Sequence, residues 1–449
     1  MKLHLPATAA LALLASVLAA THLAAATYTV DSLSALQNRI ASAKPGDTIT
    51  VKNGAYSANA DITISCAGKD KQPVTIAAET VGGVEIGGEH GFMVKNAAYV
   101  VITGFKFTHA AGRQTIDPSS SHIRYTRNTF LCPGKGYSLG VRGDDCEVDH
   151  NEFANREREG NMIDVAGRAP QVARRLWIHH NYFHDVRPSK VKDEGNGLEI
   201  IRFGLSGLSM SKGNGIVEYN LFVRCSGENE TISNKSCANT YRYNTFLDAP
   251  GGELSVRHGN DCLVYANYMR NTHGIRICGD RHKIFSNYLE KNGIGIHIAN
   301  GDGIVGDGDG GSKLTSHDRP DYVVIASNIL DGNKISFHMA GRKNGLGATH
   351  ITFANNVILD GGEAVDINGP YPDPVWLANI VWGAAATNKL PATGFQKTDP
   401  KLTRNANGIL VPAADSPMLA NNKIPGVTLP DVDTAIRPLT PADVGPAAK

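Results

Sequence analysis

Aromatic residues, an excess of charge of either sign and long hydrophobic runs are all scarce in this sequence. Of its 449 residues 7% are aromatic, and 44 Lys and Arg balance 43 Asp and Glu. The even charge excludes a basic protein that coats nucleic acid. After the first 26 residues, no apolar stretch reaches the ~20 residues needed to cross a bilayer. We therefore expect neither a nucleic-acid partner nor a membrane-spanning segment.

Stretches rich in Ala and Leu are also rare beyond residue 50, which argues against a helix bundle. Glycine, with 48 residues, and asparagine are abundant instead. Both residues are typical of turns. The composition therefore favours many short strands joined by turns.

The N-terminus has the features of a secretory signal peptide. A positive charge precedes an apolar run over residues 9–20, and three alanines at 24–26 offer a cleavage site. A membrane anchor would need ~20 apolar residues, and Thr21 and His22 interrupt the run before that length. We expect residues 1–26 to be removed on export, so that the mature protein is secreted or periplasmic.

Seven cysteines are scattered along the chain, without the Cys-x-x-Cys pair that would indicate a metal site. Their odd number leaves at least one thiol unpaired. Cys132 and Cys146, like Cys225 and Cys237, are close enough in sequence for local disulfides. Small buried core residues explain each of them equally well.

A short pattern recurs along the sequence: Asn, then any residue, then an apolar residue. It occurs ten times, at Asn128, Asn151, Asn181, Asn220, Asn244, Asn267, Asn287, Asn328, Asn356 and Asn379. The shorter intervals between copies are about 20–24 residues, and insertions account for the longer ones. A repeat of this length indicates a solenoid.

The repeat units carry strand-like runs, such as residues 99–102, 176–178 and 322–325, that are too short for helices. Three short strands and three turns per unit predict an all-β fold, a single-domain right-handed parallel β-helix. We expect each repeated Asn to adopt the left-handed conformation and to bond through its side-chain amide to the equivalent Asn one rung away, ~4.8 Å along the axis. On this interpretation the ten residues form an asparagine ladder rather than a binding site.

The ends of a solenoid need caps. Leu33, Leu36 and Ile40 have helical spacing and are followed by Pro-Gly, which predicts a short N-terminal capping helix. Beyond about residue 395 the repeat fades into a Pro-rich tail, 395–449, which we expect to pack along the coil or to cap its C-terminal end. No linker divides residues 27–449, and we expect one β-helix domain there.

Candidate metal ligands occur where Glu228 and Glu230 are separated by one residue, which places both on the same face of a strand. Two carboxylates with a further amide oxygen suit Ca²⁺. Asn196 precedes this pair by the length of one rung with an insertion. The alternative is that both glutamates are solvated on an exposed strand.

Basic residues follow the two glutamates at intervals near the repeat length. Lys235, Arg257 and Arg281 are spaced in this way along the chain. We expect these three residues to form a basic column beside the carboxylates. His258 and His282 accompany the two arginines in sequence.

Calcium, a lysine and arginines along a groove suit β-elimination in a polyuronate. The metal neutralises the uronate carboxylate and acidifies the C5 proton, a lysine removes that proton, and an arginine assists departure of the C4 oxygen. Because a lysine normally holds its proton at neutral pH, the step requires nearby cations that favour the uncharged amine.

Four motifs in this order resemble those of polysaccharide lyase family 6, which includes calcium-dependent alginate lyases and chondroitinase B. They are Asn196-Gly-Leu-Glu-Ile-Ile-Arg202, Glu228-Asn-Glu-Thr-Ile-Ser-Asn-Lys235-Ser, Val256-Arg257-His258-Gly259 and Gly279-Asp-Arg281-His282. The resemblance implies that Asn196, Glu228 and Glu230 bind calcium. It also implies that Lys235 is the base and Arg257 the acid. The residues that it implies line the groove are His258, Arg281 and His282.

The resemblance also implies an acidic polysaccharide substrate. Alginate is preferred, because it is the commonest substrate of the family and fits an exported protein. Dermatan sulfate is a second candidate that uses the same machinery, and no residue separates the two. We expect a monomer. A non-catalytic β-helix, either an adhesin or a polysaccharide-binding protein, is the alternative in which Lys235 and Arg257 are dispensable.

Overall fold

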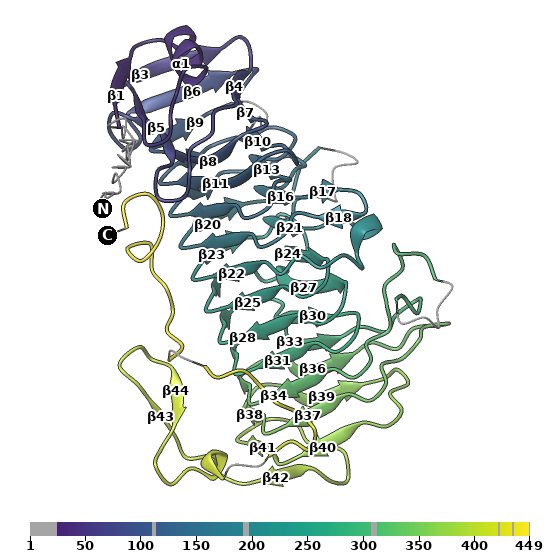
Figure 1. Ribbon diagram of the computed structural model, residues 1–449. Coiled ribbons are helices and arrows are strands. Elements are labelled where there is room, and N and C mark those ends of the chain that lie inside the picture. Colours follow the sequence, from purple (N-terminus) through teal and green to yellow (C-terminus); the bar gives the residue numbers. More distant parts are fainter. Residues whose placement is uncertain are drawn as a thin grey trace, which may run out of the picture.

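The computed structural model describes residues 25–109, 114–191, 197–306, 312–420, 423–432 and 435–448. Residues 1–24 of the predicted signal peptide lie outside these ranges, as does Asn196. Within them the chain forms a right-handed parallel β-helix made of three long parallel sheets, which confirms the predicted fold (Figure 1).

The chain visits the three sheets in turn, so each strand pairs with strands one rung before and one rung after it. Sheet A contains β1 (Thr27–Val30), β2 (Thr48–Val51), β5 (Val74–Ala78), β8 (Ala98–Thr103), β11 (Ser121–Thr126), β14 (Glu147–Asp149), β19 (Trp177–His179), β22 (Ile216–Glu218), β25 (Thr240–Arg242), β28 (Leu263–Tyr265), β31 (Lys283–Phe285), β34 (Val324–Ala326), β37 (Thr352–Ala354) and β40 (Val375–Leu377).

Sheets B and C complete each rung. Sheet B contains β3 (Gly54–Ala58), β6 (Val84–Gly88), β9 (Phe105–Phe107), β12 (Thr129–Phe130), β15 (Glu152–Ala154), β20 (Tyr182–Val186), β23 (Leu221–Cys225), β26 (Thr245–Leu247), β29 (Tyr268–Arg270), β32 (Tyr288–Glu290), β35 (Ile329–Asp331), β38 (Val357–Leu359), β41 (Asn379–Trp382) and β42 (Phe395–Lys397). Sheet C contains β4 (Ile62–Ile64), β7 (Phe92–Val94), β10 (Gln114–Ile116), β13 (Leu139–Val141), β16 (Ile163–Val165), β21 (Ile201–Phe203), β24 (Glu230–Lys235), β27 (Glu253–His258), β30 (Ile275–Ile277), β33 (Ile294–Ile298), β36 (Ile335–Met339) and β39 (Glu363–Ile367).

The core runs along the axis of the coil, because alternate residues of each short strand point inward. The apolar residue of the recurring Asn pattern is one of them. Phenylalanines at this position stack from rung to rung, with ring centroids 4.4–5.0 Å apart, in the order Phe130, Phe153, Phe183, Phe222 and Phe246. The repeat in the sequence therefore corresponds to one column of buried side chains along the coil.

The asparagine ladder is confirmed, with a correction to its backbone. Asn128 donates from its backbone N–H and its side-chain amide to Oδ1 of Asn151, at 2.9 and 3.0 Å. The same pair of bonds recurs down to Asn379. The left-handed residue is not the Asn but the one before it, such as Arg127 with φ 56°. That residue turns the chain, which leaves the Asn side chain inside the coil, where it can reach the next rung.

The predicted capping helix is also confirmed, as α1 (Leu33–Ile40). Oγ of Ser32 accepts a hydrogen bond from the N–H of Ala35 at 3.2 Å, which caps the helix N-terminus. Leu36 and Ile40 are buried, so the apolar face of α1 covers the first rung. No helix among the described residues is long and apolar enough to cross a membrane.

The segment after about residue 395 does both of the things predicted for it: its first part lies at the C-terminal end of the coil, and the rest packs along the coil. β42 still pairs with β41 in sheet B. An antiparallel hairpin, β43 (Leu402–Arg404) and β44 (Leu410–Pro412), follows. The chain then runs back along the coil, where it is drawn in yellow in Figure 1, as far as Arg127, whose Nη1 donates to the carbonyl oxygens of Pro446 and Ala448. Thr245 of β26 accepts from the N–H of Leu439 at 2.9 Å, so this tail lies outside sheet B.

The seven cysteines are all buried, and none of them is in a disulfide. Neither local disulfide forms, so the cysteines are core residues. Burial raises the pKa of the Cys66 thiol to about 11 and that of Cys262 to about 12, which keeps both thiols protonated at neutral pH.

Candidate active site

The turn from sheet B to sheet C before β24 places Glu228 against the preceding rung. A Cβ on Gly227 would lie 2.8 Å from the carbonyl oxygen of Leu198, so this turn requires glycine for its close approach. Glu228 accepts hydrogen bonds from the N–H groups of Gly197 and Leu198, at 2.7 and 3.3 Å. Its carboxylate is thus anchored beside the rung that contains β21.

Three carboxylates meet at this point: Glu199, Glu228 and Glu230 each offer an oxygen within 4.8 Å of the others. Glu199 lies one rung before Glu230, because Ile201 of β21 pairs with Ile232 of β24. Burial, followed by the charges of Glu199 and Glu230, raises the pKa of Glu228 to about 7. A cation at this point would relieve the repulsion.

A carboxylate cluster of this kind fits Ca²⁺, which prefers several oxygen ligands. Glu228 and Glu230 therefore occupy the place predicted for them. Glu199 was not among the predicted candidate ligands, although it lies in the same sequence motif as Asn196. Its place one rung before Glu230 follows from the pairing of Ile201 with Ile232, which the structure shows and the sequence does not.

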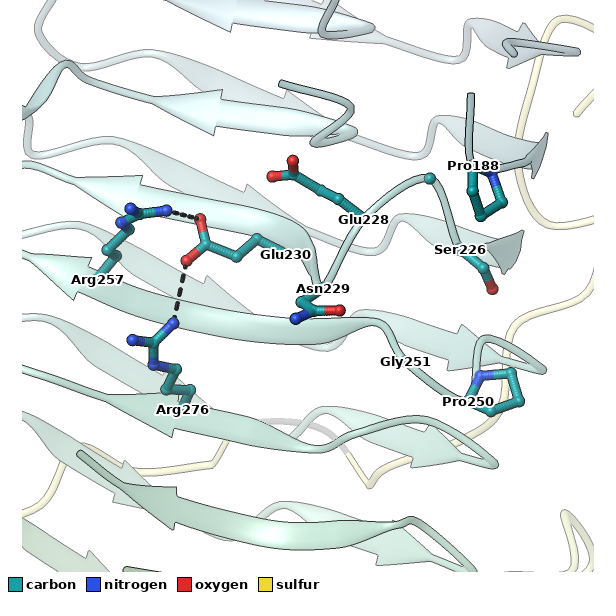
Figure 2. Close-up of a pocket in the computed structure, with 10 residues that line it drawn as sticks. Pro188, Ser226, Glu228, Asn229, Glu230, Pro250, Gly251, Arg257 and Arg276 are labelled. Carbon is teal, nitrogen blue, oxygen red and sulfur yellow. Dashed lines mark hydrogen bonds and ion pairs between the residues drawn. The ribbon is translucent and has the colours of Figure 1, made fainter. Parts of the chain in front are cut away.

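Cationic side chains lie beside two of the three carboxylates, Glu199 and Glu230. Nζ of Lys235 lies 3.2 Å from Oε1 of Glu199. Nη1 of Arg257 lies 3.1 Å from one oxygen of Glu230, and Nη1 of Arg276 lies 3.4 Å from the other (Figure 2). Burial raises the pKa of Glu230, but Arg257, a hydrogen bond from Ser233, Arg276 and Lys235 together hold this pKa below its usual value. Glu230 is thus the ionised centre of the site.

The predicted basic column is wrong at its third position. Val256 of β27 pairs with Ile277 of β30, and this rung is shorter than the interval from Arg257 to Arg281. Arg281 therefore falls beyond β30, on an exposed turn, where its Nε lies 2.9 Å from Asp261. The further guanidinium beside the carboxylates belongs to Arg276. Sequence reasoning missed it because it lies closer to Arg257 than the repeat length.

The two predicted histidines lie in different surroundings. His258 pairs in register with Lys235 and is 3% exposed, and its ring stacks on that of His317 at 5.5 Å. Burial, then His317 and Arg257, lower the pKa of His258 to about 3, so its ring is neutral at ordinary pH.

The structure does not support contact between His282 and a substrate. This side chain is 0% exposed. Its Nδ1 accepts from the N–H of Cys262, and its Nε2 lies 2.9 Å from the carbonyl oxygen of Cys278. Both ring nitrogens are used inside the coil, which makes His282 part of the core.

A cavity of about 670 Å³ opens over this cluster. Three of the predicted residues line it, together with Arg276 and the turns that join sheet B to sheet C, as Figure 2 shows. The lining residues are Pro188, Ser226, Gly227, Glu228, Asn229, Glu230, Pro250, Gly251, Arg257 and Arg276. Two guanidinium groups at an open groove suit an anionic substrate.

A second group of possible metal ligands lies on sheet A, where Glu147, Asp149 and His179 have ligand atoms within 4.8 Å of one another. Arg124 already supplies positive charge there, at 2.7 Å from Asp149 and 3.3 Å from Glu147. Both clusters contain ion pairs, but Glu228 and Glu230 of the other cluster also line a cavity.

Comparison with known proteins identifies relatives of the chain. A family model described as chondroitinase B matches residues 30–357. The solved structure of the PL6 family alginate lyase AlyGC is similar, with a TM-score of 0.78 and 25% identity over 93% of this chain. This chain spans 58% of the length of AlyGC.

Two further solved structures resemble the chain over most of both lengths. A mannuronic acid specific polysaccharide family 6 lyase from human gut microbiota has a TM-score of 0.73 and 28% identity, covering 83% of this chain and 91% of its own. A PL6 alginate lyase in complex with a trisaccharide has a TM-score of 0.74, and at 20% identity over 95% and 96% of the two chains it supports the fold alone. No curated protein matched the chain.

Proposed function

The chain belongs to the chondroitinase B family of polysaccharide lyases, polysaccharide lyase family 6, and from this membership we propose that it is an exported lyase that cleaves alginate by calcium-assisted β-elimination. The observation that carries the proposal is the cluster of Glu199, Glu228 and Glu230 with Lys235 and Arg257 beside it, under an open cavity.

The proposed reaction removes a proton and a leaving group from one uronate. Lys235, as the uncharged amine, takes the C5 proton, and the electron pair of that C–H bond forms the C4–C5 double bond. The bond from C4 to the glycosidic oxygen breaks, and Arg257 assists by donating to the departing oxygen. Glu199, Glu228 and Glu230 would hold the calcium ion, which would supply the positive charge that neutralises the uronate carboxylate.

Arg276 adds a role that the sequence did not suggest. Arg276 pairs with Glu230, as Arg257 does. Its Nη1 also lies 3.5 Å from Oε1 of Glu253, the residue one rung after Glu230. We assign Arg276 to binding of substrate carboxylates, because its guanidinium lines the cavity and can form a bidentate pair with a carboxylate.

Alginate is the preferred substrate because the similar structures at 25% and 28% identity are an alginate lyase and a mannuronic acid specific lyase. The signal-peptide pattern of residues 1–26 supports the proposed export, and a secreted or periplasmic location suits a polymeric substrate. We propose that the enzyme acts as a monomer. Dermatan sulfate is the second candidate, because the matching family model is that of chondroitinase B.

The test is to mix the purified protein with alginate and, separately, with dermatan sulfate, and to follow the ultraviolet absorbance of the unsaturated product. We expect product from alginate, loss of activity in chelator and recovery with calcium. Absence of product from both polymers would overturn the lyase proposal. Activity that survives complete metal removal would refute the calcium role, and a preference for dermatan sulfate would make that polymer the substrate.

A further inference from the structure

A second cavity, of about 470 Å³, lies near the C-terminal end of the coil. Val381, Trp382, Gly383, Ala385, Thr387 and Lys397 line it. Trp382 is 46% exposed, which is unusual for a residue with so large an apolar side chain. Val381 and Ala385 are buried and form an apolar floor. An exposed aromatic ring in a cavity marks a binding surface.

A positive charge lies at the same cavity. Lys397 is exposed, and its Nζ donates a hydrogen bond to Oγ1 of Thr387 at 2.9 Å. This contact holds the ammonium group at the cavity and leaves it further donors. The combination of an apolar face with an ammonium group suits a sugar that carries a carboxylate. The ring C–H face packs on the indole, and the carboxylate pairs with the lysine.

This cavity and the active site lie on the same corner of the coil. The active-site cavity is lined by the turns that follow β23 and β26 in sheet B. Trp382 ends β41 in sheet B, and Ala386, in the turn that follows, pairs with Glu363 of sheet C. Both cavities therefore occupy the turn from sheet B to sheet C. The C-terminal segment lies on the outer face of sheet B beside this line, where Leu439 donates to Thr245 and Arg404 lies 3.8 Å from Asp331 at the end of β35.

The separation between the two cavities follows from the strand order. Five steps along sheet B, from β26 through β29, β32, β35 and β38, lead to β41. At a rung spacing of about 4.8 Å these steps amount to about 24 Å. A polymer lying along this corner can reach both cavities at once, whereas a trisaccharide is shorter than the separation.

We propose that Trp382 and Lys397 form a second binding site for a uronate residue of the same polysaccharide chain that occupies the active site. The proposal rests on the proposed function, which makes the substrate a polyuronate. Joining two weak sites through one chain raises the effective concentration of the polymer at the active site. The second site therefore acts on binding of long substrates and leaves the chemical step unchanged.

The kinetic test compares wild type with Trp382→Ala and Lys397→Gln on polymeric alginate and on an alginate trisaccharide. We expect KM for the polymer to rise about tenfold in Trp382→Ala, because two sites that bind one chain together reach a higher avidity than either site alone. The expected kcat, and the kinetics on the trisaccharide, equal those of wild type. Lys397→Gln should also weaken the dependence of polymer KM on salt.

Trp177→Ala is the matched control, because Trp177 is an equally large exposed side chain, 42% exposed, on sheet A. Its polymer KM should equal that of wild type. Unchanged polymer KM in Trp382→Ala would overturn the second site while leaving the lyase function standing. A change in sedimentation on substitution of Trp382, without a change in KM, would make the cavity a contact between two copies of the chain and would also overturn it.

A binding measurement separates failure of this proposal from failure of the proposed function. Retardation in a gel that contains alginate is measured for Lys235→Ala and for Lys235→Ala with Trp382→Ala, neither of which requires turnover. Weaker retardation of the double variant supports the second site even if no polymer is cleaved. Equal retardation of the two variants refutes it.

Discussion

Replacing Lys235 with alanine tests the buried ion pair and the proposed base in one protein. Lys235 and Glu199 are 8% and 2% exposed, and their charged atoms lie 3.2 Å apart. The substitution leaves Glu199 buried beside two further glutamates without its cation. Removing one partner of a buried pair costs about 3–5 kcal/mol.

The size of the effect on Tm follows from the chain length. A chain of 449 residues has an unfolding entropy of about 0.9 kcal/mol/K near 60 °C. In chelator we therefore expect the Tm of Lys235→Ala to fall by about 3–5 °C. Calcium at the carboxylates replaces the missing charge, and a ligand at 100 times its Kd adds about 2.7 kcal/mol. Added calcium should thus restore about 3 °C, while cleavage of alginate stays lost.

The assay is thermal unfolding in chelator and in calcium, paired with the absorbance of the unsaturated product. Lys106→Ala is the matched control, since Lys106 pairs with Glu85 at 2.8 Å on the surface, where such pairs contribute about 1 kcal/mol or less. Equal Tm values for wild type and Lys235→Ala in chelator would refute the buried-pair reasoning. Product formation by Lys235→Ala would exclude Lys235 as the base.

Two further predictions concern the stability of the coil. Oδ1 of Asn244 accepts from both the backbone N–H and the side-chain amide of Asn220, each at 3.1 Å. Asn244→Ala leaves that buried N–H unpaired and should lower the free energy of unfolding, measured in urea, by about 1–3 kcal/mol. Asn388 is exposed, and Asn388→Ala should leave this free energy unchanged. Equal urea midpoints for the two variants would contradict the role of the ladder. Burial raises the pKa of Asp149, but Arg124 holds it well below its usual 3.8, so its stabilisation is present above about pH 4 and lost as the pH falls. Between about pH 6 and about pH 3, the Tm of Asp149→Asn should therefore fall by less than the Tm of wild type. An equal or larger fall in the variant would contradict this account.

Much of the fold could be predicted from the sequence because each rung repeats the same local solution. The recurring Asn and the apolar residue two positions later are both buried, so their pattern follows the coil directly. The same is true of the capping helix, whose apolar spacing is local. The left-handed residue before each repeated Asn was not predicted, because residues of several types occupy this position in the ten rungs. Only the backbone conformation identifies it.

Part of the candidate site could be predicted for the same reason. Glu228, Glu230 and Lys235 lie within one short segment, so their proximity needs only the strand geometry of that segment. Arg257 lies one rung later and reaches Glu230. The remaining site residues depend on how neighbouring rungs align, and rung length is not constant along this chain.

The sequence by itself determined the coil, its ladder, its cap and the chemistry of the central segment, because these follow from periodic burial and from residues close in the chain. Only the tertiary structure decided which residues of other rungs join them. The register between β24 and β27 shifts at Asn234 and Lys235, so Lys235 aligns with His258 rather than with Arg257. The next rung, from β27 to β30, is short enough to carry Arg281 out of the sheet and to leave Arg276 in it. Bulges and insertions of this kind change alignment without leaving a regular trace in the spacing of the residues.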